Sequence, residues 1–480
     1  MPQRSRITRR AALLTAAAGT VAAKFGAGAA FAQAQTQKPN ILFIMADDMG
    51  YGDLSCYGHP DIKTPRLDRL AAGGMRLVQG YANSPVCSAT RTALITGRYQ
   101  YRLRLGLEEP LLNPREDVGL PADAPTLPSL LRQAGYATML VGKWHLGMAP
   151  TFGPQLSGYE HFYGLRGGAV DYYTHLASTR KPDLWDDDKP ASDPGYLTDV
   201  LASRAVEAIN GYAKGKKPFF LSLHFTAPHW PWEAPGDEAE AERLRTRSLF
   251  HFDGGTPATY RKMVESLDTQ IGRVLDALAA NKLDQNTIVV FTSDNGGERF
   301  SFTYPFTGRK TELLEGGLRV PAIFSWPRQI TAGSVSQQVA MTMDWMPTLL
   351  AAAGAKGDAR TTPDGQNLLP QLTGASPVLP RKVFWRYKTN AQRAMRDGDF
   401  KFLKIQDNTF LFDLADDPME RANLKDRHKD VFDRLQAEWR MWNAGMLPEV
   451  DDSYVESFTG DQLADHIGSS APSKKANPAD

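Results

Sequence analysis

Short, fully apolar runs alternate with longer amphipathic stretches from Lys38 onward, and this alternation is typical of an α/β domain. A run without polar interruptions indicates a strand that is buried on both faces of a parallel sheet. Four such runs organise the chain, at residues 40–45, 137–141, 219–223 and 287–291. Amphipathic stretches at residues 126–134, 199–212, 260–280 and 344–353 predict the accompanying helices.

The pattern changes after about residue 380. Short segments at residues 383–387, 394–396, 400–404 and 410–413 predict a meander of antiparallel strands, and residues 431–444 predict a closing helix. We therefore expect an α/β fold with a mixed, mostly parallel central sheet flanked by helices over residues 38–375. A smaller C-terminal α+β domain, an antiparallel sheet plus a helix, should follow over residues 380–450, and residues 451–480 should form a polar tail.

Charged and polar side chains follow each of the four apolar runs. In chain order they are Asp47 and Asp48, then Lys143 and His145, then His229, and finally Asp294 and Asn295. Ligands in open α/β sheets bind outside the carboxyl ends of the strands. Residues that are far apart in the sequence are therefore predicted to meet in one crevice.

The two acidic pairs point to a cation. Asp47, Asp48, Asp294 and Asn295 together offer carboxylate and carboxamide oxygens, which suit a hard cation such as calcium or magnesium better than zinc. Each pair alone is equally typical of a turn or a helix cap. The metal-site interpretation therefore depends on the other motifs.

The N-terminus has the features of an export signal. Arg9 and Arg10 precede an apolar run that ends near Ala23, and residues 30–32 offer a small-residue cleavage site. We interpret residues 1–32 as a twin-arginine-type signal peptide, with a disordered basic tail as the alternative, and expect a periplasmic or secreted protein. The apolar run is too short to span a bilayer.

Removing the five basic residues of this segment leaves 50 basic against 54 acidic residues. That balance gives no support for nucleic-acid binding. No other segment has the length and apolarity of a membrane span.

Two cysteines are present, Cys56 and Cys87, which is fewer than a disulfide-stapled secreted domain contains. A bridge between them would block either as a nucleophile; otherwise Cys56 is interpreted as a small buried hydrophobic residue. Cys87 stands at a predicted helix start with Arg91 one turn later, so the two side chains can face each other.

Several ordered motifs then become specific together. Residues 87–98 read CSATRTALITGR, residues 142–147 GKWHLG, residues 227–229 APH and residues 293–296 SDNG, and Lys310 precedes EGGLRVP at 315–321. These motifs resemble the type I formylglycine sulfatases of the alkaline phosphatase superfamily, from about Pro39 to the 450s. Ala89 stands where that family usually has Pro, and Thr90 where it often has Ser.

The resemblance implies a sulfuric ester hydrolase. Cys87 would be converted to formylglycine by a formylglycine-generating enzyme. One hydroxyl of the hydrated aldehyde would attack the sulfur of a sulfate monoester, and the second would lose its proton to expel sulfate. Calcium, with magnesium as a second choice, would be held by Asp47, Asp48, Asp294, Asn295 and an oxygen of residue 87.

The resemblance also assigns the basic residues. Arg91 would hold the diol, Lys143 would contact its hydroxyl, and His145 would be the base that starts elimination. His229 and Lys310 would bind the sulfate and assist the leaving alkoxide. Each of these residues alone is as typical of a bonded loop histidine or a solvated lysine, so the assignment depends on their shared placement.

Three alternatives remain open at this stage. They are a phosphonate or phosphate diester hydrolase on the same scaffold, a metal-independent thiol hydrolase, and a non-catalytic binder of sulfated glycans. We expect a sulfated small molecule or sulfated carbohydrate as substrate. Candidate contacts are Trp230 and Trp232, the loop with Asp171, Tyr172, Tyr173 and His175, and the cations Arg102, Arg104 and Arg166.

Overall fold

The computed structural model describes residues 38–112, 115–251 and 253–456. The predicted signal peptide, residues 1–32, lies outside the described residues. From Pro39 onward the chain belongs to one compact unit. Among the described residues, no helix is both long and apolar enough to cross a membrane.

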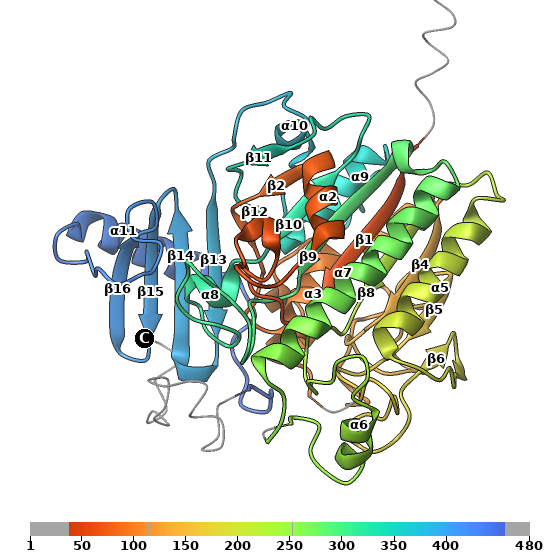
Figure 1. Cartoon of the computed structure of the whole chain (residues 1–480). Helices are drawn as coiled ribbons and strands as arrows, with labels where there is room; N and C mark the ends of the chain where they lie inside the picture. The colour runs from red at the N-terminus through yellow and green to blue at the C-terminus, as the bar shows by residue number, and fades with distance from the viewer. Residues whose placement is uncertain (1–37, 113–114, 252, 457–480) are drawn as a thin grey trace, which may run out of the picture. The chain divides into compact units, whose positions relative to one another are not determined.

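A mixed, mostly parallel sheet forms the centre of the fold, as predicted (Figure 1). Its ten strands in the described part of the chain are, in spatial order, β11 (Ser334–Ser336), β2 (Met75–Leu77), β10 (Ala322–Ser325), β9 (Thr287–Ser293), β1 (Asn40–Ala46), β8 (Phe219–His224), β4 (Ala137–Gly142), β5 (His161–Gly164), β6 (Trp185–Asp186) and β7 (Lys189–Pro190). The five strands from β9 to β5 are parallel, and β10, β6 and β7 are antiparallel to a neighbour. The four predicted apolar runs are therefore neighbouring central strands.

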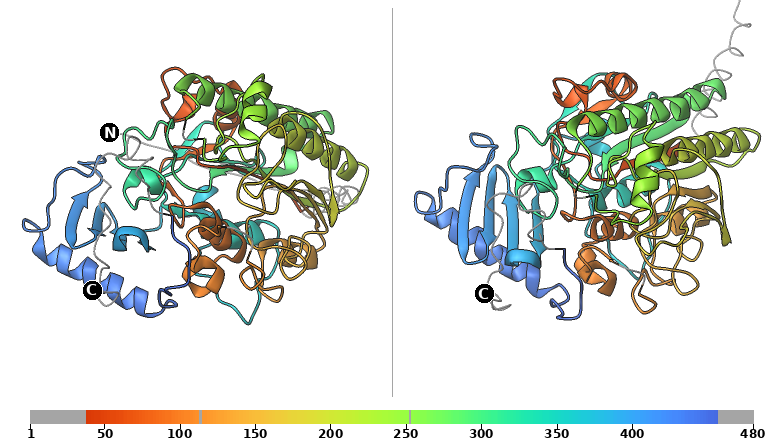
Figure 2. Two further views of the ribbon diagram at one scale, coloured as in Figure 1. Left: turned by 90° about the horizontal axis from the view of Figure 1, so that it is seen from below. Right: turned by 60° about the horizontal axis from the view of Figure 1, so that its bottom comes forward.

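Alternate side chains of the central strands enter two separate cores. In β1, Leu42 and Ile44 pack on one side, while Phe43 and Met45 pack on the other. Figures 1 and 2 show helices on both faces of the sheet. The first core includes α2 (Pro65–Gly73), α5 (Leu197–Tyr212) and α7 (Pro257–Ala280), and the second includes α3 (Cys87–Thr96), α4 (Leu127–Gln133) and α9 (Trp345–Ala352). A strand with two buried faces explains why the runs lack polar alternation.

The C-terminal part is an antiparallel sheet with one helix, as predicted. The strands are β13 (Lys382–Tyr387), β14 (Gln392–Asp397), β15 (Phe400–Ile405) and β16 (Asn408–Asp413), and the helix is α11 (Lys429–Ala444). Phe402 and Leu411 pack against Trp439 of α11 on one face. Trp385, on the other face, donates from Nε1 to the carbonyl of Ala82, 2.9 Å away. The small sheet is thus joined by a continuous core to the larger α/β part of the chain, residues 39–375.

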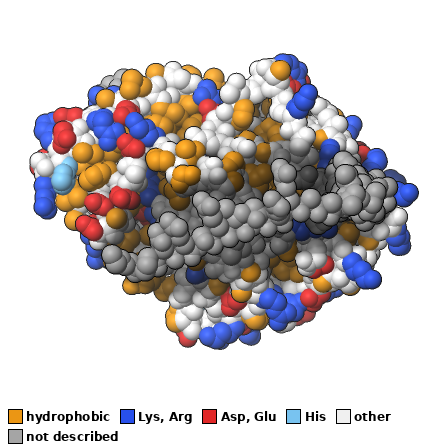
Figure 3. Space-filling view, turned by 90° about the horizontal axis from the view of Figure 1, so that it is seen from above, with side chains coloured by type: hydrophobic (Ala, Val, Ile, Leu, Met, Phe, Trp, Pro, Cys, Tyr) orange, Lys and Arg blue, Asp and Glu red, His pale blue; other side chains and the backbone are white. Residues whose placement is uncertain are grey.

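Shorter elements complete the fold. They are β3 (Gly80–Tyr81), β12 (Ala340–Met341), α6 (Glu238–Leu244), α8 (Glu315–Leu318), α10 (Leu369–Leu372), and the 3₁₀ turns η2 (Ser55–Tyr57), η3 (Gln100–Arg102), η4 (Arg104–Leu107), η5 (Asp284–Asn286), η6 (Thr342–Asp344) and η7 (Thr389–Ala391). Figure 3 shows basic and acidic side chains interspersed around the margins of the face seen from above.

The chain after α11 returns to the larger α/β part. The amide of Glu109 donates to the carbonyl of Tyr454 at 3.0 Å, and the amide of Glu456 donates to the carbonyl of Glu109 at 2.8 Å. Residues 451–456, the start of the predicted tail, are therefore held against the larger α/β part. Residues 457–480 lie outside the described residues.

Candidate active site

The Asp47–Asp48 pair and the Asp294–Asn295 pair meet because their strands are neighbours. Asp47 and Asp48 follow β1, and Asp294 and Asn295 follow the adjacent β9. The amide of Asp48 donates to Asp294 Oδ1 at 3.2 Å, and Asn295 Nδ2 donates to Asp48 Oδ1 at 2.7 Å. Asp48 has a φ of 61°, a left-handed conformation that non-glycine residues adopt mainly where function or packing requires it.

Helix α3 places residue 87 at its first turn. The hydroxyl of Thr90 accepts from the amide of Ser84 and donates to the carbonyl of the same residue, both at 2.9 Å. These two bonds close the loop that leads into the helix. The free backbone amides of the first helical turn add a partial positive charge near Cys87.

Three buried cations pair with the three buried carboxylates. Lys143 Nζ lies 2.5 Å from Asp47 Oδ2, and Lys310 Nζ lies 2.8 Å from Asp48 Oδ2. The third pair joins Arg91 Nη2 to Asp294 Oδ2 at 2.8 Å. All six side chains are at most 2% exposed. Opposite charges in such contact offset part of the cost of burying each of them.

Two buried oxygen atoms between the strand ends lack a hydrogen-bond partner within the described part of the chain. Asp47 Oδ1 and Asn295 Oδ1 are buried and have no hydrogen-bond partner among the described residues. Ligand atoms of Asp47, Asp48, Cys87 and His229 lie within 4.8 Å of one another. Burial, with Asp294 next, raises the pKa of Asp47 to about 8, although Lys143 and Arg91 oppose this shift. A hard divalent cation fits this donor set, because it would satisfy these oxygens and favour the ionised carboxylate.

The two histidines present one ring nitrogen each to the site. His145 Nε2 lies 2.7 Å from the carbonyl of Leu111 and must donate to it, which leaves Nδ1 as a lone pair without a described partner. His229 Nδ1 is held by the carbonyl of Trp230 at 2.6 Å, and its Nε2 lies 3.5 Å from Asp48 Oδ2. Burial lowers the pKa of both imidazoles well below the usual value, with Lys143 and Lys310 adding to the effect. Both rings are therefore neutral near pH 7.

An unmodified Cys87 would be a poor nucleophile. Burial raises the pKa of its thiol to about 12, although Lys143 and Lys310 act in the opposite direction. A thiol attacks through its thiolate, so this environment disfavours the thiol-hydrolase alternative. Cys56 and Cys87 are both free, so no bridge blocks residue 87. Cys56 is only half-buried, less than predicted.

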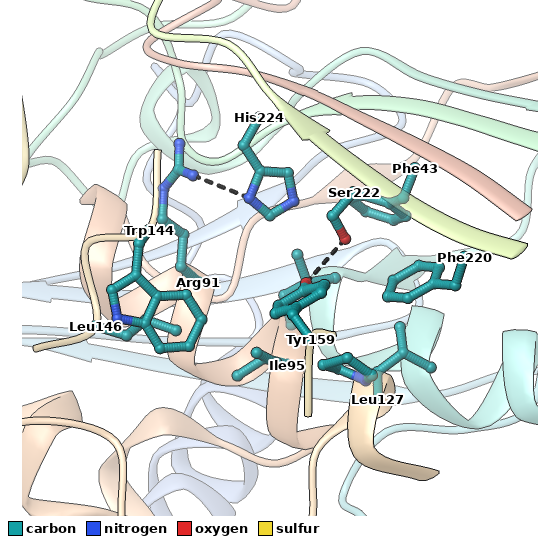
Figure 4. Close-up of a pocket in the computed structure, with 12 residues that line it drawn as sticks. Phe43, Arg91, Ile95, Leu127, Trp144, Leu146, Tyr159, Phe220, Ser222 and His224 are labelled. Atoms are coloured by element: carbon teal, nitrogen blue, oxygen red, sulfur yellow. Dashed lines mark hydrogen bonds between the residues drawn. The ribbon is translucent and has the colours of Figure 1, made fainter. Parts of the chain in front are cut away.

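Arg91 has support on the side away from the carboxylates. Figure 4 shows His224, at the end of β8, facing the guanidinium, with its Nδ1 3.4 Å from Arg91 Nη1. Burial, and then Arg91 itself, lowers the pKa of His224 to about 3, so the ring is neutral rather than a competing cation. A cavity of about 20 Å³ beside them, which Tyr159 and Ser222 also line, is large enough for about one water molecule.

A cavity of about 530 Å³ opens onto the cluster. Cys87, His145, His229 and Lys310 line it together, so the chemistry predicted for separate motifs has one location. Its lining also includes Arg166, Trp185, Trp230, Phe250 and Glu456. The rings of Trp230 and Phe250 lie 4.4 Å apart and form an apolar wall.

Some of the residues predicted to contact substrate line the cavity, and others do not. Trp230 and Arg166 line the cavity, and Trp185, Phe250 and Glu456 are additions that no sequence motif indicated. Trp232, Asp171, Tyr172, Tyr173 and His175 do not line it. The hydroxyl of Tyr172 instead donates to the carbonyl of His229 at 3.0 Å, which holds the histidine loop. Arg102 is engaged by Asp364, and Arg104 by Glu108.

Known proteins share both the sequence and this fold. The sulfatase family model matches residues 39–355, and the model for the C-terminal region of N-sulphoglucosamine sulphohydrolase matches residues 309–443. N-acetylgalactosamine-6-sulfatase of Canis lupus familiaris is 34% identical over 78% of this chain and 73% of its own length. Arylsulfatase A of Bos taurus is 31% identical over 83% of this chain and 85% of its own.

Solved structures agree with these relatives. The crystal structure of Ps i-CgsB has a TM-score of 0.78 and 30% identity, covering 90% of this chain and 98% of that one. A phosphonate monoester hydrolase of Agrobacterium radiobacter, at 22% identity and a TM-score of 0.61, shares the fold. The family match covers more than half of the chain, and both relatives named above are sulfatases. The chain therefore belongs to the sulfatase family and is a sulfuric ester hydrolase.

Proposed function

We propose that this enzyme removes sulfate from a sulfated carbohydrate, with residue 87 acting as formylglycine beside a calcium ion. Magnesium is the second choice of cation. The ligands would be Asp47, Asp48, Asp294, Asn295 and an oxygen of residue 87. One observation carries this proposal. Among the described residues, Asp47 Oδ1 and Asn295 Oδ1 have no hydrogen-bond partner, and they lie beside a cavity that Cys87 lines.

The modified residue and the cation supply what the unmodified chain lacks. The hydrated aldehyde offers one hydroxyl for attack on sulfur and a second whose deprotonation expels sulfate. A bound divalent cation lowers the pKa of an oxygen that it contacts.

The chain's own residues orient the groups and move protons. Arg91 holds Asp294 and, through it, the acidic loop. Lys143, fixed by Asp47, is placed to contact the hydroxyl of residue 87. The free Nδ1 of His145 would accept the proton that starts elimination.

His229 and Lys310 would act on the sulfate and the leaving group. Both line the cavity, and the His229 ring is turned by its Nδ1 bond so that Nε2 faces the cluster. Fixed cations and donors of this kind stabilise charge that develops in the transition state. The departing alkoxide would take its proton from Lys310, because the neutral His229 ring keeps its one proton on Nδ1, where it donates to the Trp230 carbonyl.

The carbohydrate assignment is supported by the cavity and by relatives. Trp230 and Phe250 offer a face on which the C–H side of a sugar ring can pack. One relative is named for a sulfated amino sugar, and a related crystal structure is a complex with a neocarrahexaose.

Two measurements test the proposal. We expect kcat/KM to be higher on 4-nitrophenyl sulfate than on an aryl phosphonate monoester; a strong preference for the phosphonate would favour the phosphonate and phosphodiester alternative instead. Mass spectrometry across residues 84–91, after co-expression with a formylglycine-generating enzyme, should show the cysteine converted to the aldehyde. Active enzyme with an unmodified Cys87 would contradict the proposed nucleophile.

We also propose export through a twin-arginine-type signal. Arg9 and Arg10 before an apolar run support it. Replacing both arginines by lysine should leave the protein inside the cell, and N-terminal sequencing of the exported form should begin after residue 32.

A further inference from the structure

Arg166 is a nearly buried cation that the proposed chemistry does not use. Its side chain is 7% exposed, and it lines the 530 Å³ cavity together with Cys87 and His145. Its Nε is buried and has no hydrogen-bond partner among the described residues. A buried N–H donor without an acceptor is costly, so a guanidinium in this state at a cavity wall is suited to an acceptor that a ligand brings.

The contacts of the guanidinium leave it able to bind a ligand. Both of its side-chain hydrogen bonds in the described part of the chain start from Nη2, to the carbonyl of Asp187 at 3.2 Å and to Asp188 Oδ1 at 3.1 Å. Asp188 is 80% exposed, and an ion pair with so exposed a partner contributes little. Arg166 Cζ lies 4.0 Å from the ring centre of Trp185, which also lines the cavity. This stacking engages the face of the guanidinium and not its N–H donors.

The fold sets Arg166 to one side of the reacting end of the cavity. Arg166 follows β5, and its carbonyl accepts from the amide of His145 at 3.2 Å. Neighbouring strands lie about 4.8 Å apart, so β5 is roughly 14 Å from β1, which leads into Asp47. The stack on Trp185 of β6 directs the side chain further from β1. This separation is wider than one sugar ring, so a group bound at Arg166 belongs to a neighbouring sugar.

A second cation belongs to the same part of the lining. Lys181 is exposed, lines the cavity and forms no ion pair within the described residues. Asp183, an acid of the lining, is already engaged, because its Oδ1 accepts from the amide of Arg166 at 3.1 Å and from Trp185 Nε1 at 2.7 Å. The guanidinium and the ammonium are therefore the charges that a ligand can meet here.

We infer that Arg166, supported by Lys181, forms a subsite for a second anionic group, a sulfate or a carboxylate, on the sugar next to the one that loses its sulfate. The inference rests on the proposed function and narrows its substrate to a polyanionic saccharide. A guanidinium can bind two oxygens of either anion through parallel N–H donors. A neutral sugar at that position would lack this contact.

The test measures how well disaccharides inhibit the hydrolysis of 4-nitrophenyl sulfate. Each disaccharide in the panel has one sulfate on one ring, and its other ring is neutral, carries a sulfate or carries a carboxylate. Inhibition reports binding whether or not the disaccharide is itself cleaved.

The variant is Arg166→Gln, and Arg204→Gln is its matched control. Arg204 also stacks on an aromatic ring, that of Tyr163 at 4.6 Å, and pairs with a half-exposed acid, Asp186. Unlike Arg166, it does not line the cavity.

Wild type should bind the anionic forms more tightly than the neutral form. Arg166→Gln should raise the inhibition constants of the anionic forms by about tenfold to a hundredfold, the worth of a charge-assisted hydrogen bond. The constant of the neutral form should change by less than about threefold, and Arg204→Gln should keep the wild-type preference. A preference for only one of the two anions, lost in Arg166→Gln, would identify that anion as the ligand.

Equal weakening of all three forms in Arg166→Gln would overturn the inference, because Arg166 would then act through the loop that contacts His145. A wild type that does not prefer the anionic forms would overturn it too, as would a preference that Arg166→Gln retains. Wild-type turnover of 4-nitrophenyl sulfate, which has no second anion, reports separately on the proposed function.

Discussion

Two clusters of buried charge differ sharply in what surrounds them. The active-site cluster consists of Asp47, Asp48, Arg91, Lys143, Asp294 and Lys310. The interface cluster, where the C-terminal sheet meets the catalytic part, consists of Tyr81, Glu315, Arg319, Lys401 and Glu420. Both combine acids and bases, and Glu315 and Lys401 are as completely buried as Asp47 and Asp48.

The interface cluster is held mainly by its own members; Glu420 Oε1 has no hydrogen bond among the described residues but forms an ion pair with Lys401. Lys401 Nζ lies 2.9 Å from Glu315 Oε1 and 2.8 Å from Glu420 Oε1. Glu315 Oε2 accepts from Tyr81 at 2.6 Å and from Arg319 at 2.8 Å. None of these residues lines the large cavity. Such a cluster joins two parts of the fold.

At the active-site cluster and the adjoining Asn295, Asp47 Oδ1 and Asn295 Oδ1 have no hydrogen-bond partner in the described part of the chain, and a cavity lies beside them. The comparison teaches that buried charge alone does not mark a site. Acceptor atoms that the chain itself does not satisfy, next to space for a ligand, do mark one.

The largest expected effect comes from removing the proposed nucleophile. Cys87→Ala should lower kcat on 4-nitrophenyl sulfate on the order of a millionfold, as loss of a covalent nucleophile does elsewhere. The fold should persist, because Cys87 makes no ion pair that holds the cluster. Steady-state kinetics and the urea midpoint of unfolding measure the two properties.

Cys87→Ser sharpens this result. A serine has one hydroxyl, so it can be sulfated but cannot eliminate sulfate as the hydrate would. Rapid mixing should show at most one turnover, with a sulfated peptide by mass spectrometry. Sustained turnover near the wild-type rate would contradict the elimination step.

The second-largest effect should come from removing the cation, which should affect the active-site cluster and not the interface cluster. Chelation with EDTA should abolish activity and lower the melting temperature, and added calcium should restore both. At a thousandfold excess over its Kd, a bound cation stabilises the fold by about 4 kcal/mol. Asp48→Asn should lose this calcium-dependent shift, whereas the interface variant Lys401→Met should keep it. A melting temperature that is indifferent to EDTA would remove the proposed metal site.

The parts of the site that follow parallel strands could be predicted from sequence. The carboxyl ends of parallel strands meet at one edge, so Asp47, Lys143 and Asp294 had to converge once the strands were identified. Residue 87 was found by its motif, and its helix start was visible in the pattern.

Other residues of the site and of the interface cluster could not be predicted, because no local sequence pattern marks them. Glu456 is placed by the β-bridge between Glu109 and the preceding Val455, a contact between segments far apart in the chain that no periodicity encodes. Lys401 alternates with Phe402 in β15 and would be assigned to solvent by its charge, yet its face is covered by the catalytic part. The resemblance placed Glu315 among the family motifs, and only the structure shows that it belongs to the interface cluster.

Lys401→Met tests the interface cluster directly. The variant leaves Glu315 and Glu420 without their shared cation, and breaking a buried pair in this way costs about 3–5 kcal/mol. Urea denaturation should show that loss, while kcat of the folded enzyme stays within about twofold. Lys382→Met is the matched control, because the half-exposed pair with Glu438 is worth at most about 1 kcal/mol. A large fall in kcat for Lys401→Met alone would mean that the clusters are coupled.

The smallest expected effect is a pH dependence of the same interface. Burial raises the pKa of Glu420 from 4.5 to about 7; Lys401 opposes this, and the neighbouring Glu315 adds to it. A raised acid pKa means that the folded state holds its proton longer than the unfolded state. Stability is therefore lost as pH rises from about 4.5 to 7, and levels off above that.

Glu420→Gln removes this proton, so the variant supplies the reference. The unfolding free energy of the wild type relative to Glu420→Gln should fall by about 3 kcal/mol across that pH interval. Urea titrations at several pH values measure the difference, with Asp452→Asn as a surface control that should show no such trend. A difference that rises with pH would mean that Lys401 keeps Glu420 ionised throughout. The interface cluster would then hold two full carboxylate charges on one lysine, and the contrast with the active site would rest on its unfilled oxygens alone.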